Sequence, residues 1–245
     1  MRILIGVDDT DNSESRGTGY CARRLGEELE AQGLASVQSI TRHQLLVDPR
    51  IPYTSHNSAA CLLVDVEAAQ HGRVAEYCRA YLLQASAPGA DAGLCLAEWE
   101  QAASVQAFGR LAKCEVLDQP AALKLALQRG ISLEGLTGTR GGVIGALAAV
   151  ALRAEGNDGR CLWLRGLREL TGIQTAAQLR QLVSIDRIER VAGGEVPPAA
   201  RIDVSAWPRP ILRAGQMVLL VEEADAHDDH EWRVARKEII RQYSD

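Results

Sequence analysis

The stretch RILIGVDDTD, residues 2–11, decides the fold of this chain. Its apolar run predicts a short buried strand over Arg2–Val7, followed by a polar loop over residues 8–19 that is rich in Gly, Ser and Thr. A helical pattern over Tyr20–Gln32 comes next, and Gly33 fits a helix C-terminus. Strands and helices go on alternating in this way. We therefore predict the fold class α/β (α+β) with a mixed sheet.

The rest of the chain extends this alternation and then departs from it. Apolar runs and helical periodicity predict strands over 37–46, 59–66 and 94–98, and helices over 68–84, 101–111, 119–129 and 143–153. Beyond Gly156 the predicted elements are short, with several prolines, and a charged amphipathic helix is expected over Glu231–Tyr243. The predicted domains are a main body over 1–155 and a C-terminal extension over 156–245.

Composition excludes several classes of protein. The net charge is −5 and no run of Lys or Arg is present. Release of counterions by basic residues supplies most nucleic-acid affinity, so this charge balance disfavours a dedicated nucleic-acid-binding module. It does not exclude a local basic patch. None of the six cysteines forms a C-x-x-C pair, so we expect no zinc ribbon but buried thiols in a reducing compartment. No apolar run reaches the about 20 residues that cross a bilayer. The first strand follows Met1 directly, and we expect a cytoplasmic protein with no membrane partner.

Three carboxylates, Asp8, Asp9 and Asp11, lie within four residues at the end of the first strand. Carboxylates so close repel one another, and a cation would relieve that repulsion. Mg²⁺ suits such a site, because it favours one or two carboxylates together with phosphate oxygens. The alternative is a solvated acidic turn. The small residues that follow, among them Gly17 and Thr18, favour the metal site, since they let backbone N–H groups approach an anion at a helix start.

A second Gly-rich loop, Gly138-Thr139-Arg140-Gly141-Gly142, runs directly into the predicted helix at 143. Backbone donors, the helix dipole and one guanidinium together make a phosphate cradle. The loop lacks the Gly-Lys-Ser/Thr of a Walker A motif. A tight loop packed against the helix is the alternative interpretation.

A third polar loop, residues 48–58, holds two prolines and ends at an apolar strand. Thr54, Ser55, His56 and Asn57, followed by Ser58, are suited to orienting a substrate or phosphate. His56 is a candidate general base, although a single loop histidine is more often simply solvated.

The DAHDDH segment, residues 225–230, combines metal-binding residue types at irregular spacing. Its alternative interpretation is a solvated acidic N-cap of the helix expected after it. The chain has no Gly-x-Ser-x-Gly, no His-Glu-x-x-His and no Gly-x-Gly-x-x-Gly after a strand. This weighs against hydrolases of those kinds and against dinucleotide binding.

Four segments together resemble the N-terminal part of archaeal tRNA-Ile 2-agmatinylcytidine synthetase. They are Ile5–Asp11, Asp48–Ser58, the Pro88-Gly89 loop and Gly141–Ala149. The resemblance covers about residues 1–155, and the order and spacing of the segments make it specific. That family uses ATP to activate a cytidine of the tRNA anticodon and then joins agmatine to it.

The resemblance implies a kinase-like domain with a ferredoxin-like part at about residues 60–130. It implies ATP and Mg²⁺ as cofactors near the acidic loop and the second Gly-rich loop. In the family a threonine after the acidic loop is linked to phosphate chemistry, and Thr18 is its nearest counterpart. Taken together, the residue patterns and the resemblance predict catalytic roles for Asp8, Asp9, Asp11, Thr18 and His56, metal binding for Asp8, Asp9 and Asp11, and cofactor binding for Gly17, Asn57, Ser58, Arg140, Gly141 and Gly142.

The chain also departs from the family. Where the family has an Arg-Gly-Asn type of loop, this sequence has Thr54-Ser55-His56-Asn57, so the asparagine carries over and the arginine does not. The family continues into a nucleic-acid-binding fold and a zinc ribbon, whereas residues 156–245 carry no Cys pair and no basic cluster along the sequence.

Three hypotheses follow. The preferred one is an ATP- and Mg²⁺-dependent phosphotransferase or ligase that acts on a small molecule or nucleotide. The second is tRNA cytidine modification with a partner protein holding the tRNA, which the acidic balance disfavours. The third is a non-enzymatic nucleotide-binding module. A homodimer is compatible with all three.

Overall fold

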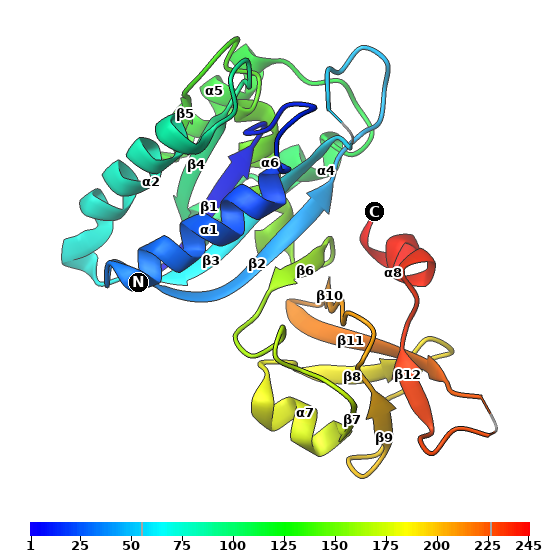
Figure 1. Cartoon of the computed structure of the whole chain (residues 1–245). Helices are drawn as coiled ribbons and strands as arrows, with labels where there is room; N and C mark the ends of the chain where they lie inside the picture. The colour runs from blue at the N-terminus through cyan, green and yellow to red at the C-terminus, as the bar shows by residue number, and fades with distance from the viewer. Residues whose placement is uncertain (55, 226) are drawn as a thin grey trace. The chain divides into compact units, whose positions relative to one another are not determined.

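The structure is a computed structural model that describes residues 1–54, 56–225 and 227–245. The chain divides into two compact units, Met1–Glu155 and Gly156–Asp245. Figure 1 labels the elements of both units. Ser55, which the sequence places in the substrate loop, lies outside the described residues.

The first unit alternates strands and helices. Its elements are β1 (Arg2–Asp8), α1 (Thr18–Ala31), β2 (Ser36–Gln44), β3 (Ser58–Asp65), a 3₁₀ turn (Ala68–Gln70), α2 (His71–Ala85), β4 (Gly93–Glu98), α3 (Trp99–Ala103), α4 (Gln106–Leu111), α5 (Gln119–Gln128), β5 (Ser132–Gly135) and α6 (Val143–Glu155). The predicted α/β (α+β) class is confirmed at that level.

The strands of the first unit pair in the order β5-β4-β1-β3-β2, and each of these pairs is antiparallel. The mixed sheet predicted for this body is therefore not what these residues form. The elements β1-α1-β2-β3-α2-β4, with strand order 4-1-3-2, make a ferredoxin-like arrangement over residues 2–98. The resemblance implied this part at about 60–130 instead. The difference arises because Ile3 of β1 pairs with Val64 and Glu98, partners that no local pattern identifies.

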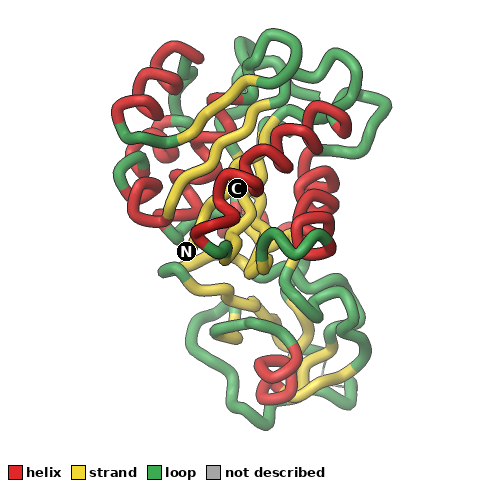
Figure 2. The backbone as a smooth tube through the Cα atoms, turned by 90° about the vertical axis from the view of Figure 1, so that its left-hand side faces the viewer, coloured by secondary structure: helices red, strands yellow, loops and turns green. Residues whose placement is uncertain are grey.

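Helices cover both faces of this sheet. Helix α1 contacts β2 and β3, and α2 contacts β4, while α6 contacts β1, β3 and β4 on the opposite face (Figure 1). Figure 2 shows the red helices on both sides of the yellow strands. Alternate residues of β1 face α6, beginning with Leu4 in the shared apolar core. At Gly6, a Cβ would overlap the Ala146 carbonyl, so β1 and α6 pack backbone against backbone.

The second unit is richer in strand. It contains β6 (Arg160–Trp163), β7 (Ile173–Thr175), α7 (Ala176–Leu182), β8 (Arg187–Arg190), β9 (Arg201–Asp203), β10 (Ile211–Arg213), β11 (Gln216–Glu223), β12 (Trp232–Val234) and α8 (Lys237–Ser244). The strands follow the order β6-β10-β11-β12-β9-β7, with β8 paired to β11. Parallel pairs occur here, β8 with β11 and β9 with β12. The unit has its own apolar core.

The helix expected over Glu231–Tyr243 is only partly formed. Trp232–Val234 is instead the strand β12, since its residues pair with β11, as Val234 does with Val221. The helix begins at Lys237. Among the described residues, no helix combines the length and the apolar character needed to cross a membrane. Five of the six cysteines are buried as expected, but Cys114 is exposed.

Candidate functional site

A pocket of about 220 Å³ lies in the first unit, where β1 ends. It brings together the acidic loop, the loop before β3, the end of the loop before β4, the connection between α4 and α5, and the start of α6. Residues singled out by the sequence that line it are Asp8, Asp9, Asp11, Thr18, Thr54, His56, Asn57, Ser58 and Gly141. Three predicted cofactor-binding residues, Gly17, Arg140 and Gly142, are not part of this lining.

Asp8 and Asp9 are the most strongly perturbed acids of the pocket. Burial, followed by the charge of Asp9, raises the pKa of Asp8 to about 8. Burial, followed by the charge of Asp91, raises the pKa of Asp9 to about 6. Asp8 packs so closely under α6 that a Cβ at Gly145 would overlap its carboxylate. Asp9 has a φ of 52°, in the left-handed region that non-glycine residues rarely adopt.

Asp11 organises the start of α1. One of its carboxylate oxygens accepts hydrogen bonds from the Thr18 amide (3.1 Å) and hydroxyl (2.8 Å), and the other accepts from the Thr54 hydroxyl (2.8 Å). The Thr18 hydroxyl also accepts from the Thr10 amide at 3.1 Å. Gly17 occupies the N-cap position of α1 and supplies no side-chain cap. Asp11 therefore takes the place of a cap, and it links α1 to the loop before β3.

Asp91 is a pocket residue that no sequence motif had identified. Its carboxylate accepts hydrogen bonds from the Thr139 amide (2.5 Å) and hydroxyl (2.7 Å), and its carbonyl accepts from the Gly142 amide (2.9 Å). Asp91 thus holds the second Gly-rich loop against the loop before β4, and its charge acts on Asp9 of the acidic loop. The only signal in the sequence was its position in a Pro-Gly loop directly before a strand.

The second Gly-rich loop is divided between structural and site-facing residues. The Gly142 amide donates its hydrogen bond to the Asp91 carbonyl, and a Cβ at Gly142 would overlap the backbone of Gly93. Arg140 is exposed and has a φ of 67°. Gly141 lines the pocket at the N-terminal end of α6, where the first amides of a helix have no intrahelical acceptor. The predicted phosphate-binding role suits Gly141 best.

The loop before β3 closes another side of the pocket. The Asn57 side chain donates to the Leu46 carbonyl at 2.6 Å, so it closes the loop on itself. Arg50 makes a two-pronged ion pair with Asp48, with both contacts at 2.8 Å. His56 is exposed and lines the pocket, and Ser58 begins β3. Ser55 cannot be placed, because it lies outside the described residues.

The charge balance of the lining favours a cation. Arg50 is the one arginine among the lining residues, and none of them is a lysine. Five acidic residues line the pocket: Asp8, Asp9, Asp11, Asp91 and Glu115. Among the residues that the structure describes, no group of three or more His, Cys, Asp or Glu side chains is arranged to hold a metal ion. Asp8, Asp9 and Asp11 therefore form no ready-made cage. The high pKa values of Asp8 and Asp9 still fit Mg²⁺, which needs only one or two carboxylates when phosphate oxygens complete its shell.

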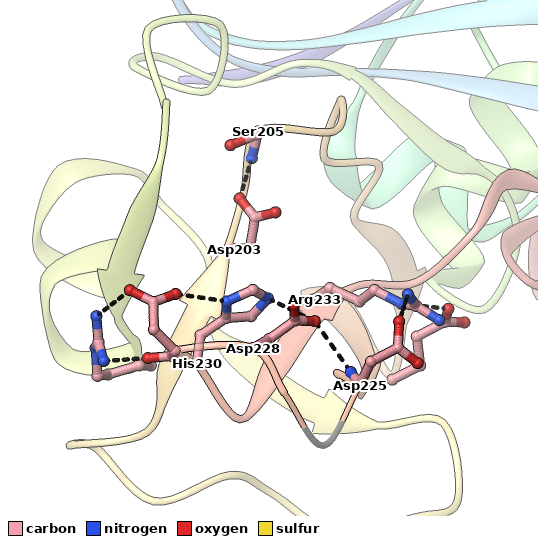
Figure 3. A network of polar contacts seen from close by, with 9 residues as sticks. Asp203, Ser205, Asp225, Asp228, His230 and Arg233 are labelled. Atoms are coloured by element: carbon pink, nitrogen blue, oxygen red, sulfur yellow. Dashed lines mark hydrogen bonds and ion pairs between the residues drawn. The ribbon is translucent and has the colours of Figure 1, made fainter.

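The described residues of the DAHDDH segment belong to the second unit, in the connection between β11 and β12 (Figure 3). His230 contacts Asp229 at 3.2 Å and Asp228 at 3.9 Å, and Arg233 lies 3.5 Å from Asp225. A strand follows the segment, so it is not the N-cap of a helix. The arrangement is a network of polar contacts on the second unit.

Comparison with known proteins places the first unit in context. No protein-family model matches the chain. The uncharacterized protein MJ0921 of Methanocaldococcus jannaschii is 28% identical over 152 residues, which are 62% of this chain and 50% of that protein. The chain thus spans about half the length of this curated relative.

Solved structures show the same relationship. The crystal structure of apo TiaS, a tRNA agmatidine synthetase, matches with a TM-score of 0.54 and 28% identity, over 62% of this chain and 35% of TiaS. The complex of TiaS with its tRNA and ATP matches with a TM-score of 0.55 and 28% identity, over 62% of this chain and 36% of that one. The complex of TiaS with its tRNA, AMPCPP and agmatine matches with a TM-score of 0.53 and 27% identity, over 61% of this chain and 36% of that one. The similarity to the agmatinylcytidine synthetase is therefore confirmed, over about a third of that enzyme.

Proposed function

We propose that the pocket of the first unit binds ATP with Mg²⁺, and that the chain is an ATP-dependent phosphotransferase or ligase for a small molecule or nucleotide. One observation carries the proposal: Asp8 and Asp9 meet Gly141 and the start of α6 in one pocket. Two half-buried carboxylates with raised pKa values favour a cation, while a helix N-terminus favours an anion. A metal–phosphate pair satisfies both requirements at once.

Each part of the lining has a role in this proposal. Asp8 and Asp9 hold the metal, which when bound offsets the charge that develops on a transferring phosphoryl group. The Gly141 amide and the α6 dipole bind phosphate oxygens. Asp11, Thr18 and Thr54 position the surrounding loops through their hydrogen bonds.

The other side of the pocket suits the acceptor substrate or the nucleobase of ATP. Apolar side chains line it near the polar loop before β3: Leu45, Ile51, Pro52, Ala112, Val116, Leu117 and Ile144. Such a wall accepts a planar ring, while His56 and Asn57 at its edge supply polar contacts. His56 is the candidate general base, since it is the one histidine among the residues that line the pocket.

The known structures support the nucleotide part of the proposal most directly. TiaS has been crystallised with ATP and with AMPCPP, in the presence of tRNA. These complexes also favour a second candidate function, modification of a tRNA cytidine with a partner protein that holds the tRNA. The net charge of −5 and the match to only about a third of TiaS count against it.

The test is ATP consumption with identification of the product. Wild type, Asp9→Asn and the matched control Asp65→Asn are incubated with ATP and candidate acceptors, in Mg²⁺ or in EDTA; Asp65 is an exposed acid at the end of β3. We expect Mg²⁺-dependent turnover in wild type and Asp65→Asn, and about a hundredfold loss in Asp9→Asn, the scale of losing one electrostatic contact to a transition state. ADP identifies a phosphotransferase, and AMP identifies a ligase that adenylates its substrate.

Other outcomes separate the alternatives. Turnover that requires tRNA would support the second candidate. Nucleotide binding by calorimetry with no product would indicate a binding module. Absence of Mg²⁺-nucleotide binding in the wild-type protein would refute the proposal.

A further inference from the structure

The second unit contains two arginine–tryptophan pairs, whose arginines are three residues apart in the chain. The Arg168 guanidinium lies over the Trp207 ring, 4.5 Å from its centroid, and Arg165 lies over Trp163 at 5.9 Å. Arg209 donates a hydrogen bond to the Trp207 carbonyl at 3.0 Å. These five residues form what we call the Arg–Trp patch. Both distances are within the range of about 6 Å at which a cation is attracted to a ring face.

The patch is assembled from two chain segments that are distant in sequence. The first follows β6 and turns at Gly166, whose φ is 78°. Leu164 and Leu167 anchor this turn in the core, so that Arg165 and Arg168 are left exposed. The second segment joins β9 to β10. The two segments meet where the Cys161 amide donates to the Pro210 carbonyl at 2.7 Å.

The second segment is held rigidly. Pro208 and Pro210 flank Arg209 and are both buried, while Trp207, directly before them in the chain, remains 41% exposed. Proline restricts the backbone, and the buried rings fix the position of the loop. A preformed surface loses little conformational entropy when it binds a partner.

The region carries an excess of positive charge. Segments 160–170 and 205–210 contain four arginines and a single acid, Glu169. Burial, together with the positive charges of Arg241 and Arg209, lowers the pKa of Arg160, although Asp245 lies 3.5 Å away and opposes the shift. Guanidinium groups that repel one another favour an anionic partner. This gathering of charge was not visible along the sequence, in which residues 156–245 show no basic cluster.

We infer that the Arg–Trp patch binds single-stranded nucleic acid. The exposed ring of Trp207 can stack on a base of any sequence, and the arginine edges around it can bind phosphates. An arginine whose face lies on a ring still presents its N–H groups sideways, toward a backbone that passes the ring. A lipid surface fits less well, because Trp163 is half-buried and no amphipathic helix among the described residues presents this patch. The inference does not rest on the proposed function, since binding here requires no ATP.

The test is direct binding, measured by fluorescence anisotropy on the full chain without nucleotide. The probe is a labelled oligouridylate of about 12 nucleotides, within the span of single-strand sites. Trp207→Ala should weaken binding about tenfold, as expected for the loss of one stacked base, whereas Trp207→Phe retains a ring and most of the affinity. The matched control Arg180→Ala removes an exposed arginine of α7 that pairs with Glu195, and it should bind as wild type does.

The salt dependence gives an independent readout. The double variant Arg168→Ala/Arg209→Ala should reduce the slope of log K against log salt by about 1.4, since each phosphate contact on a single strand contributes about 0.7. Circular dichroism and the urea midpoint check that each variant folds. Wild-type affinity in folded Trp207→Ala, or an unchanged slope in the double variant, would overturn the inference. Binding to phosphatidylserine vesicles without binding to the oligonucleotide would overturn it as well.

Discussion

The carboxylate of Asp8 makes the first unit sensitive to pH in a way that one substitution should remove. Its pKa in the folded chain is raised to about 8 from the ordinary value of 3.8, first because it is buried and then because Asp9 lies beside it. The folded chain therefore holds this proton more tightly than the unfolded chain does. The contribution of protonated Asp8 to the free energy of unfolding is fully present below pH 3.8. It is lost as the pH rises toward about 8.

The magnitude follows from the shift. One pKa unit corresponds to about 1.36 kcal/mol, so between pH 3.8 and pH 7, where the folded chain keeps the Asp8 proton that the unfolded chain releases, Asp8 removes at most about 4 kcal/mol of stability. Asp9, whose pKa is raised to about 6, also lowers the stability as the pH rises from 3.8, and most of its loss is complete at pH 6. Between pH 6 and pH 8 the contribution of Asp8 to the slope amounts to at most about 2.7 kcal/mol.

The assay is urea unfolding at pH 6, 7 and 8 in EDTA, followed by circular dichroism. Wild type should lose stability over this interval, whereas Asp8→Asn, which keeps the shape without the charge, should give a flat profile. The control Asp65→Asn, exposed on the same sheet, should follow wild type. Adding Mg²⁺ should restore wild type at pH 8 more than it restores Asp8→Asn, because ligand binding to the folded state adds to stability. Parallel profiles for wild type and Asp8→Asn would refute the reasoning.

Three further predictions concern other residues. Gly6→Ala should lower the unfolding free energy by about 2 to 4 kcal/mol, because its Cβ would overlap the Ala146 carbonyl; a urea midpoint equal to that of wild type would contradict this. Thr18→Val, which removes one of the two hydroxyl donors to the Asp11 carboxylate, should cost about 1 to 2 kcal/mol and weaken nucleotide binding in calorimetry, while Thr18→Ser, which keeps the hydroxyl, should retain wild-type stability and binding. Cys114 should be the one thiol that reacts rapidly with a colorimetric thiol reagent in the folded chain, and all six should react in urea; rapid reaction of several thiols without urea would argue against the five buried positions.

Local patterns in the sequence predicted much of the first unit. The run RILIGV specified the buried strand β1, and the periodicity after residue 143 specified α6, because these signals come from neighbouring residues. The clustering of Asp8 and Asp9 at a strand end pointed to the pocket for the same reason. Repulsion between adjacent carboxylates is present in the sequence before any fold is known.

Other features depended on contacts between distant parts of the chain. The strand order of the first sheet, the role of Asp91 and the use of the Gly142 amide all follow from pairings across many residues. Trp232–Val234 has a helix-like pattern but forms a strand, because β11 supplies a partner for its backbone.

The sequence by itself thus determined which carboxylates repel one another, which apolar runs form buried elements and which glycines allow turns, since those properties belong to each residue and its neighbours. Only the tertiary structure decided which of them meet. It separated Arg140 and Gly142 from the pocket lining and brought Asp91 into it, because the antiparallel pairing of β1 with β4 sets that loop beside the acidic one. In the same way it gathered Arg168 and Trp207 from separate loops into one surface.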